Sequence, residues 1–170
     1  MPTQLICVAG LPGCGKSVVA RLLAERLDGL LLRTDAIRKE LFAAPDYSPE
    51  ESIRTYAAFY RRAGEGLTGG RSVVMDATFF SHDSREKAAA IARRASVPWR
   101  LLLVTAPEEI VRERIARRTN DISDADFRVY LEMKAIFDPM TETHIEIDNR
   151  GGLPELAAQV DEVARIVNQT

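Results

Sequence analysis

The chain has 170 residues, of which 46% are apolar and 28% are charged, and its formal net charge is −2. This length fits one domain over residues 1–170, and the mild acidity argues against a protein that coats nucleic acid. No run of 18 apolar residues is present, so no membrane-spanning helix is predicted. With two cysteines and no basic leader, we expect a cytoplasmic protein without a disulfide framework.

Short apolar runs alternate with longer segments of helical periodicity along the whole chain. The predicted strands cover residues 5–9, 30–33, 72–75, 99–104 and 144–147. The predicted helices cover residues 16–27, 36–42, 49–67, 83–95, 107–118, 123–137 and 154–167. Asp35 is the expected cap of the second helix, and Ser48 is that of the third, in a capping box with Glu51. The alternation predicts a parallel sheet covered by helices on both faces, with ligands at the carboxyl ends of the strands.

A glycine-rich segment with the spacing G-x-x-x-x-G-K-[ST] follows the first predicted strand and opens the first predicted helix. It consists of Gly10, Leu11, Pro12, Gly13, Cys14, Gly15, Lys16 and Ser17. In this context backbone N–H groups cradle phosphate oxygens, Lys16 reaches the β- and γ-phosphates, and the Ser17 hydroxyl binds Mg²⁺. We therefore predict a P-loop that binds ATP and Mg²⁺ through this segment and the adjoining Val18. Cys14 is interpreted as a tolerated small side chain, with a redox-sensing thiol as the alternative.

Asp35 and Arg38 follow the second predicted strand, at the edge of the sheet where the P-loop should lie. The carboxylate of Asp35 can accept the proton of an attacking hydroxyl, and Arg38 can hold the acceptor or the transferring phosphoryl group. The alternative is a helix-capping aspartate beside a surface arginine. Next to a P-loop, we favour the catalytic interpretation for both residues.

The third predicted strand ends in a carboxylate, Asp76, after an apolar run. Such a carboxylate can hold Ser17 or orient Mg²⁺, as in a Walker B motif. Contact with the acceptor and simple capping of the strand end are the alternatives for Asp76. Thr78 and Arg85 lie just beyond it, and we expect them in the acceptor pocket or, alternatively, in solvated loops.

Residues 112–121 are rich in arginine and enter a polar loop. Arg114 and Arg118 share the face of the predicted helix, with Arg117 beside them, and such like charges repel unless an anion lies between them. A triphosphate would supply this anion, so residues 114–125 are predicted to form a lid over ATP. A solvated face, with Glu113 and Asp121 as partners, is the alternative. Residues 147–152, at the end of the last strand, should also face the nucleotide.

These residues together resemble the small AAA-type predicted kinases, and the P-loop kinase families typified by polynucleotide 5′-hydroxyl kinase, gluconate kinase and zeta toxins. The resemblance rests on residues 10–17, 34–38, 75–79 with Arg85, 114–118 and 123–126. It implies a nucleoside-monophosphate-kinase-like sheet of five parallel strands ordered 2-3-1-4-5. It also implies that Asp35 is a general base, that Asp35 and Arg38 handle the acceptor, and that Arg117 contacts the donor phosphates. Val18 departs from the pattern, in which threonine is usual.

Three functions remain open at this point. The first is an ATP-dependent kinase that phosphorylates a hydroxyl of a small molecule. The second is a kinase for the 5′-hydroxyl end of a nucleic acid, which Arg38, Arg85 and the arginine-rich segment could bind in a narrow channel. The third is an ATPase or nucleotide-dependent switch with a protein partner. The slightly acidic composition favours the first over the second, and Asp35 and Arg38 disfavour the third.

Overall fold

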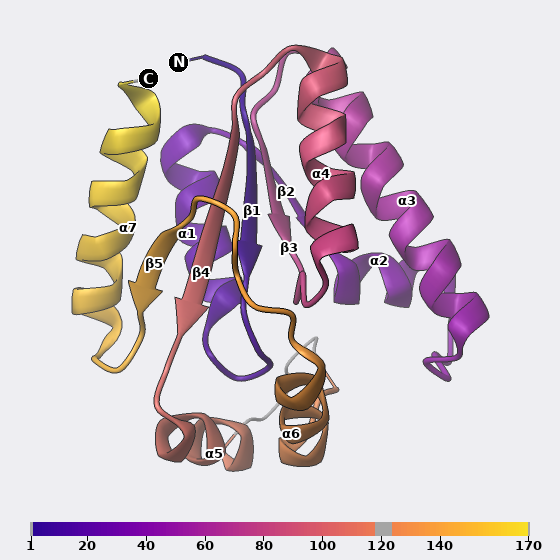
Figure 1. Cartoon of the computed structure of the whole chain (residues 1–170), viewed down its shortest axis with the longest axis vertical. Helices are drawn as coiled ribbons and strands as arrows, with labels where there is room; N and C mark the ends of the chain where they lie inside the picture. The colour runs from indigo at the N-terminus through magenta and orange to yellow at the C-terminus, as the bar shows by residue number, and fades with distance from the viewer. Residues whose placement is uncertain (1, 118–123, 170) are drawn as a thin grey trace.

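Five parallel strands form the centre of the protein, in a computed structural model that describes residues 2–117 and 124–169 (Figure 1). The strands are β1 (Leu5–Ala9), β2 (Leu30–Arg33), β3 (Val73–Asp76), β4 (Trp99–Thr105) and β5 (Ile145–Asp148). Their order in the sheet is β2-β3-β1-β4-β5, and every neighbouring pair is parallel. The fold is therefore the α/β P-loop fold with the predicted strand order.

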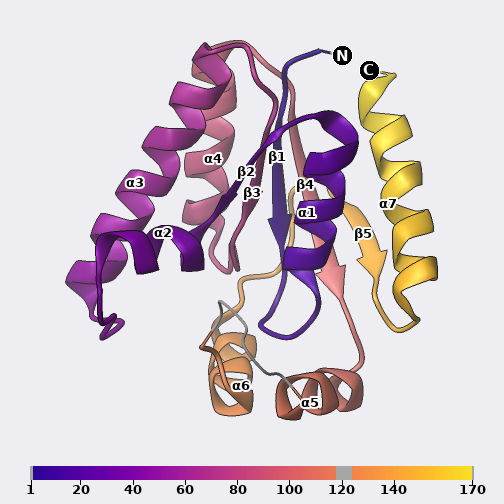
Figure 2. The same cartoon turned by 180° about the vertical axis from the view of Figure 1, so that it is seen from behind.

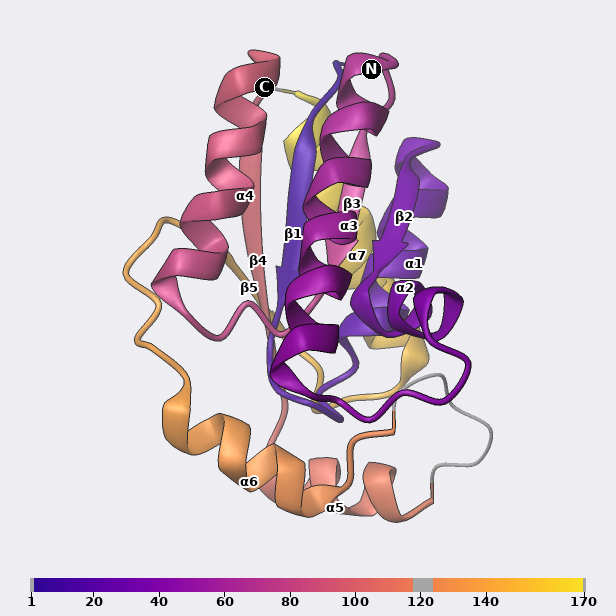
Figure 3. The ribbon, with the colours of Figure 1, turned by 90° about the vertical axis from the view of Figure 1, so that its right-hand side faces the viewer.

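Helices cover both faces of this sheet, which makes three layers (Figures 1 and 2). One face carries α1 (Lys16–Leu27) and α7 (Leu153–Asn168), and the other carries α3 (Pro49–Thr68) and α4 (His82–Ala95). The shorter helices α2 (Thr34–Leu41), α5 (Glu108–Ala116) and α6 (Phe127–Ile136) complete the elements of the described chain. Figure 3 shows that α5 and α6 lie beyond the carboxyl ends of the strands. Among the described helices, none is long and apolar enough to cross a membrane.

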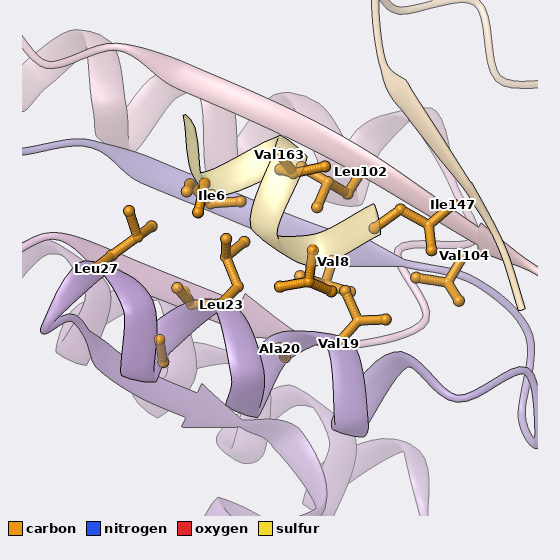
Figure 4. Packing of buried hydrophobic residues seen from close by; sticks show 14 of the residues in the cluster. Ile6, Val8, Val19, Ala20, Leu23, Leu27, Leu102, Val104, Ile147 and Val163 are labelled. Carbon is orange, nitrogen blue, oxygen red and sulfur yellow. The ribbon is translucent and has the colours of Figure 1, made fainter. Parts of the chain in front are cut away.

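Two apolar cores, one on each side of the sheet, hold the layers together. All five residues of β1 are buried, as expected for a central strand with both faces covered. Ile6 and Val8 point toward α1 and α7, where they pack with Val19 and Leu23 of α1 (Figure 4). The alternate β1 residues belong to the core beneath α3 and α4. This packing fixes the position of the loop that follows β1.

The start of the second helix differs from the sequence expectation. Strand β2 ends at Arg33 and α2 begins at Thr34, so no loop residue separates the two elements. Arg33, in extended conformation, is the N-cap residue, and Asp35 lies within the first turn of the helix. The expectation that Asp35 caps this helix was therefore wrong. Asp35 is instead an acidic residue of the first turn of α2, two positions after the end of β2.

Only one of the two hydrogen bonds of the capping box predicted at the start of α3 is formed. Ser48 Oγ accepts a hydrogen bond from the N–H of Glu51 at 3.3 Å, as expected. The Glu51 carboxylate, however, accepts from the N–H groups of Asp46 (3.1 Å) and Tyr47 (3.0 Å) instead of from Ser48. The N–H of Ser48 donates to the Asp46 carboxylate at 2.8 Å. Glu51 thus organises the loop before α3 in addition to the helix end.

Two other helices are shorter than predicted. The expected helix 107–118 is observed over Glu108–Ala116, and residue 118 lies outside the described residues. The expected helix 123–137 begins at Phe127, because the Asp126 carboxylate accepts from the N–H of Val129 at 2.9 Å and caps the helix there. Residue 123 also lies outside the described part of the chain.

Candidate active site

The loop from Gly10 to Ser17 has a backbone that only glycine allows at several positions. Gly10, Gly13 and Gly15 have φ of 147°, 78° and 96°, which side chains other than glycine rarely adopt. A Cβ on Gly15 would also lie 2.1 Å from Asn149 Nδ2. Gly15 is the N-cap of α1 and provides no side-chain cap. The loop therefore presents the N-terminal N–H groups and positive dipole end of α1, the arrangement that binds phosphate groups.

Lys16 Nζ donates to the carbonyl oxygen of Leu11 at 3.0 Å, across the same loop. Leu11 and Gly13 are half-buried, and Val18, further along α1, packs partly against the core. The hydrogen bond from Lys16 to the Leu11 carbonyl holds the ammonium group over the concave side of the loop. A phosphate oxygen is a stronger acceptor for it than a neutral carbonyl.

Cys14 is buried, with 2% of its surface exposed. Burial raises the pKa of the Cys14 thiol above its ordinary value, and the nearby charge of Lys16 offsets this only in part. The thiol therefore stays protonated at neutral pH, whereas redox-sensing cysteines are exposed thiolates. The position supports the interpretation of Cys14 as a small packing residue.

Three side chains meet at the carboxyl ends of β2 and β3. The hydroxyl of Ser17 donates to Asp76 Oδ2 at 2.6 Å. The Arg33 guanidinium donates to both of these groups, from Nε to Asp76 Oδ2 at 3.1 Å and from Nη2 to Ser17 Oγ at 2.9 Å. The contact between Ser17 and Asp76 is the one expected of a Walker B carboxylate.

Sequence reasoning missed Arg33. Its signal was available in principle, because Arg33 ends β2 and is the direct neighbour of Asp76 in the register of the parallel pair β2 and β3. That register becomes visible only once the two strands are aligned. The pairing brings a cation to the carboxylate that we had assigned to magnesium.

Ser17 and Asp76 fit a magnesium site in their chemistry. A hydroxyl and a carboxylate oxygen are hard ligands, and the cationic Arg33 bonded to both shows that the pair attracts positive charge. Among the described residues, no cluster of three or more His, Cys, Asp or Glu side chains could hold a metal. Protein Mg²⁺ sites commonly use one or two carboxylates, with nucleotide phosphates and water as the other ligands. Ser17 and Asp76 would hold Mg²⁺ in this way.

Asp35 lies on the same edge of the sheet, two residues after Arg33. Burial is the main reason why the pKa values of Tyr47 and Tyr56 are raised, to about 12 for Tyr56, and the negative charge of Asp35 adds to both shifts. Asp76 contributes to the shift of Tyr56 as well. The negative charges of Asp35 and Asp76 thus both act on the Tyr56 hydroxyl. The role of Asp35 toward an acceptor stays a prediction.

Arg38 is 7% exposed and is committed to α3. Its guanidinium donates to Glu51 Oε2 at 3.5 Å and to Ser52 Oγ at 3.3 Å, and it stacks 4.8 Å from the ring centre of Tyr47. These contacts tie α2 to the start of α3. Contact of Arg38 with the acceptor stays a prediction.

The arginines of the predicted lid take different positions. Arg114 reaches the β5–α7 loop, where Nη2 donates to Asn149 Oδ1 at 3.3 Å and to the Gly151 carbonyl at 3.5 Å. Arg117 has an 81% exposed side chain paired with Glu113 at 3.4 Å, which is the solvated pairing that we gave as the alternative. Arg118 lies outside the described residues. Of the two arginines that the structure describes, Arg114 is the one linked to the P-loop, through Asn149.

Asn149 connects this arginine to the P-loop. It is 5% exposed, and its side-chain Nδ2 donates to the Cys14 carbonyl at 2.8 Å. Helix α5 also packs on the loop, because a Cβ on Gly13 would lie 2.9 Å from Val111 and Ile115. The end of β5 thus faces the P-loop, as expected.

A pocket of about 250 Å³ adjoins the P-loop between β4, α5 and α6. Its walls are mostly apolar and include Leu11, Thr105, Tyr130 and Phe137. Pockets with apolar walls and a few polar groups are the usual form of small-molecule sites. Tyr130 and Phe137 were not among the site residues that we predicted, since helical apolar residues give no separate signal for a pocket.

Residues 5–140 match the family model described as AAA domain. The chain belongs to the AAA domain family. This family match covers the P-loop, the Ser17–Asp76 pair and Asp35, and it agrees with the AAA-type part of the resemblance.

Curated relatives match this chain over part of their own length. A UPF0200 protein from Aeropyrum pernix is 36% identical over 132 residues, covering 69% of this chain and 66% of its own. The chain spans between 29% and 66% of the length of the curated relatives it matches.

Two solved kinase structures share the fold. The APS kinase from Mycobacterium tuberculosis, in complex with AMPPNP and APS, has a TM-score of 0.73 at 16% identity, with 98% of each chain covered. A gluconokinase from Sinorhizobium meliloti 1021 has a TM-score of 0.66 at 21% identity, with 98% and 96% covered. The AAA domain chain thus has the fold of small-molecule kinases, and its P-loop implies that a nucleotide binds.

Thr78 and Arg85, which we expected in the acceptor pocket, form hydrogen bonds to other parts of the fold. The Thr78 carbonyl accepts from the N–H of Gly10 at 3.2 Å and ties the loop after β3 to the P-loop. Arg85 has no exposed surface. It donates to Glu142 Oε1 (2.8 Å), to the Phe79 carbonyl (3.0 Å) and to the Pro139 carbonyl (3.1 Å). In this arrangement Arg85 fastens α4 to the segment before β5 and cannot reach an acceptor.

Replacing Arg85 with Met should destabilise the AAA domain strongly. The change leaves Glu142 without its guanidinium partner, and the buried Phe79 carbonyl and the Pro139 carbonyl without this donor. Removing one partner of a buried ion pair commonly lowers the free energy of unfolding by about 3–5 kcal/mol. Urea unfolding measures this change, and a loss below about 1 kcal/mol would contradict the structural role. The double variant R85M/E142Q should lose less than the sum of the single variants.

The same ion pair should make stability depend on pH. Burial alone would raise the pKa of Glu142, but the hydrogen bonds from Arg85, from its own backbone and from His82 outweigh burial and lower it. A carboxyl whose pKa is lower in the folded state stabilises the fold above its unfolded pKa. The wild type should lose this contribution as the pH falls through the lower, folded pKa. E142Q should lack this part of the fall in the free energy of unfolding at low pH. If that free energy fell equally in both proteins, the Glu142 ion pair would not be its cause.

Proposed function

We propose that this protein is an ATP-dependent kinase that transfers the γ-phosphate of ATP to a hydroxyl of a small molecule. One observation carries the proposal: Ser17 of the P-loop donates to Asp76 at the end of β3 at 2.6 Å, and Asp35 lies in the first turn of the helix that follows the neighbouring strand β2. A phosphate-binding loop, a cation-holding carboxylate and a second carboxylate for the acceptor are the parts that phosphoryl transfer to an alcohol requires.

Each residue has a distinct task in the proposed reaction. The N–H groups of residues 13–17 and the ammonium of Lys16 bind the β- and γ-phosphates and offset charge in the transition state. Ser17 and Asp76 would hold Mg²⁺, which would supply positive charge to offset the charge of the phosphates. Asp35 accepts the proton of the acceptor hydroxyl as the oxygen bonds to the γ-phosphorus and the bond to the ADP oxygen breaks. Arg114, held by Asn149, lies where it can contact the donor nucleotide.

The 5′-hydroxyl end of a nucleic acid is less well supported as the phosphoryl acceptor. A channel for a nucleic-acid strand would need free cations along its length. Two of the arginines that we had considered for it, Arg38 and Arg85, are buried against Glu51 and Glu142.

Labelled ATP with Mg²⁺ and a panel of acceptors tests the proposal. The panel contains sugars, sugar acids, nucleosides, aminoglycosides and 5′-hydroxyl oligonucleotides. We expect label on one class of small molecule. Label on the oligonucleotides alone would replace the small-molecule acceptor with a nucleic-acid end. No labelled acceptor, together with hydrolysis that a protein partner stimulates, would replace the kinase with an ATPase or switch.

A further inference from the structure

Arg33 is placed where a divalent cation would have to bind. Its guanidinium donates to Ser17 Oγ at 2.9 Å and to Asp76 Oδ2 at 3.1 Å, and these two oxygens are themselves 2.6 Å apart. The three groups form a closed ring of hydrogen bonds. The same two oxygens, one on the P-loop and one at the end of β3, are the protein ligands proposed above for Mg²⁺.

The ring uses the electron pairs that a metal would need. A serine hydroxyl has one proton to donate and two lone pairs, and here the proton goes to Asp76 while Arg33 takes a lone pair. Asp76 is 5% exposed, and the hydrogen bonds that it accepts from Ser17 and Arg33 both fall on Oδ2. A second cation on this oxygen pair would be repelled by the guanidinium at close range.

Arg33 is well placed to stay in this position. Its side chain is 18% exposed, and its backbone is fixed because it pairs with Asp76 in the register of β2 and β3. A buried carboxylate requires a positive partner, so Arg33 supplies the charge that Asp76 needs. The arginine is long enough to leave the pair by side-chain rotation while the strand stays in place.

We propose that Arg33 is a resident cation of the Ser17–Asp76 pair that competes with Mg²⁺. It is a positioning residue: it keeps the two ligands together, and it must release them before Mg²⁺ binds to them. The protein therefore binds Mg·ATP only above a magnesium threshold that Arg33 sets. This inference rests on the proposed function in one respect, the binding of ATP with Mg²⁺ at the P-loop.

Equilibrium dialysis of labelled ATP over a series of Mg²⁺ concentrations tests the competition, with EDTA as the metal-free point. We expect Arg33→Gln to lower the Mg²⁺ concentration at half-maximal binding about tenfold, which corresponds to ~1.4 kcal/mol. Arg33→Lys retains one charge but loses the two-pronged contact, so its midpoint should lie between the other two. Binding in EDTA should be equal in all three proteins.

The control is Arg26→Gln, which removes the same charge from an arginine near the far end of α1, where it pairs with Asp161. Its midpoint should equal that of the wild type. An unchanged midpoint in Arg33→Gln, with normal thermal unfolding, would overturn the competition and leave ATP binding intact. Weaker ATP binding in Arg33→Gln with and without Mg²⁺ would overturn it too, because Arg33 would then be a phosphate ligand. If Arg33→Gln does not fold, the Arg33→Lys midpoint decides in the same way. A wild type that binds no ATP at any Mg²⁺ concentration would instead remove the proposed function.

Discussion

Replacing Asp35 with Asn should reduce phosphoryl transfer by about two to four orders of magnitude while ATP affinity stays nearly unchanged. General-base catalysis contributes factors of about this size, and an amide cannot accept the proton of the acceptor hydroxyl. The change keeps the size of the side chain and its place in the first turn of α2. Single-turnover transfer rates and the Kd of ATP, measured on the same preparation, give both quantities.

Asp161→Asn is the matched control for Asp35→Asn. Asp161 lies on α7 and pairs with Arg26 on the outer surface, so its change removes one carboxylate without touching the sheet edge. Its transfer rate should equal that of the wild type. A loss of ATP binding in step with activity in Asp35→Asn would show that Asp35 acts on the donor nucleotide and is no base.

Replacing Lys16 with Ala should abolish measurable transfer and weaken ATP binding roughly 10- to 150-fold. Hydrogen bonds to charged groups contribute about 1.5–3 kcal/mol, and the ammonium of Lys16 is the full positive charge within the P-loop segment. Its Nζ already lies over the loop, bonded to the Leu11 carbonyl at 3.0 Å. Calorimetric titration with Mg·ATP measures the loss of affinity.

Lys87→Ala is the control for Lys16→Ala. Lys87 is 59% exposed on α4 and pairs with Asp83, so its removal should leave both ATP affinity and transfer unchanged. If Lys16→Ala retained the affinity of the wild type, the nucleotide would not be bound by its phosphates at residues 10–17.

The fold and the donor side of the site could be predicted because their signals are local. The P-loop pattern occupies eight consecutive residues, and the five apolar runs that form the sheet each lie between helical segments. The contact of Ser17 with Asp76 followed from the rule that parallel strands end at one edge. The P-loop and the strands need no knowledge of which side chains meet, and the Ser17–Asp76 contact needs only the shared edge of the parallel strands.

Arg33 and Arg85 could not be assigned correctly because their partners are far along the chain. Arg33 is separated from Asp76 by 43 positions, and Arg85 from Glu142 by 57. Arg85 lies just beyond Asp76 in the sequence, so we expected it in the acceptor pocket or in a solvated loop. Its complete burial depends on how the segment before β5 returns across α4, which periodicity does not indicate.

Phosphorus NMR of ATP, Mg²⁺ and an acceptor from the labelled class tests the central claim most directly. The account predicts a new phosphate-ester signal that grows in equal amount with ADP, requires Lys16 and Asp35, and carries the phosphoryl group on the acceptor. ADP that accumulates with inorganic phosphate alone, at the same rate with and without the acceptor, would contradict it.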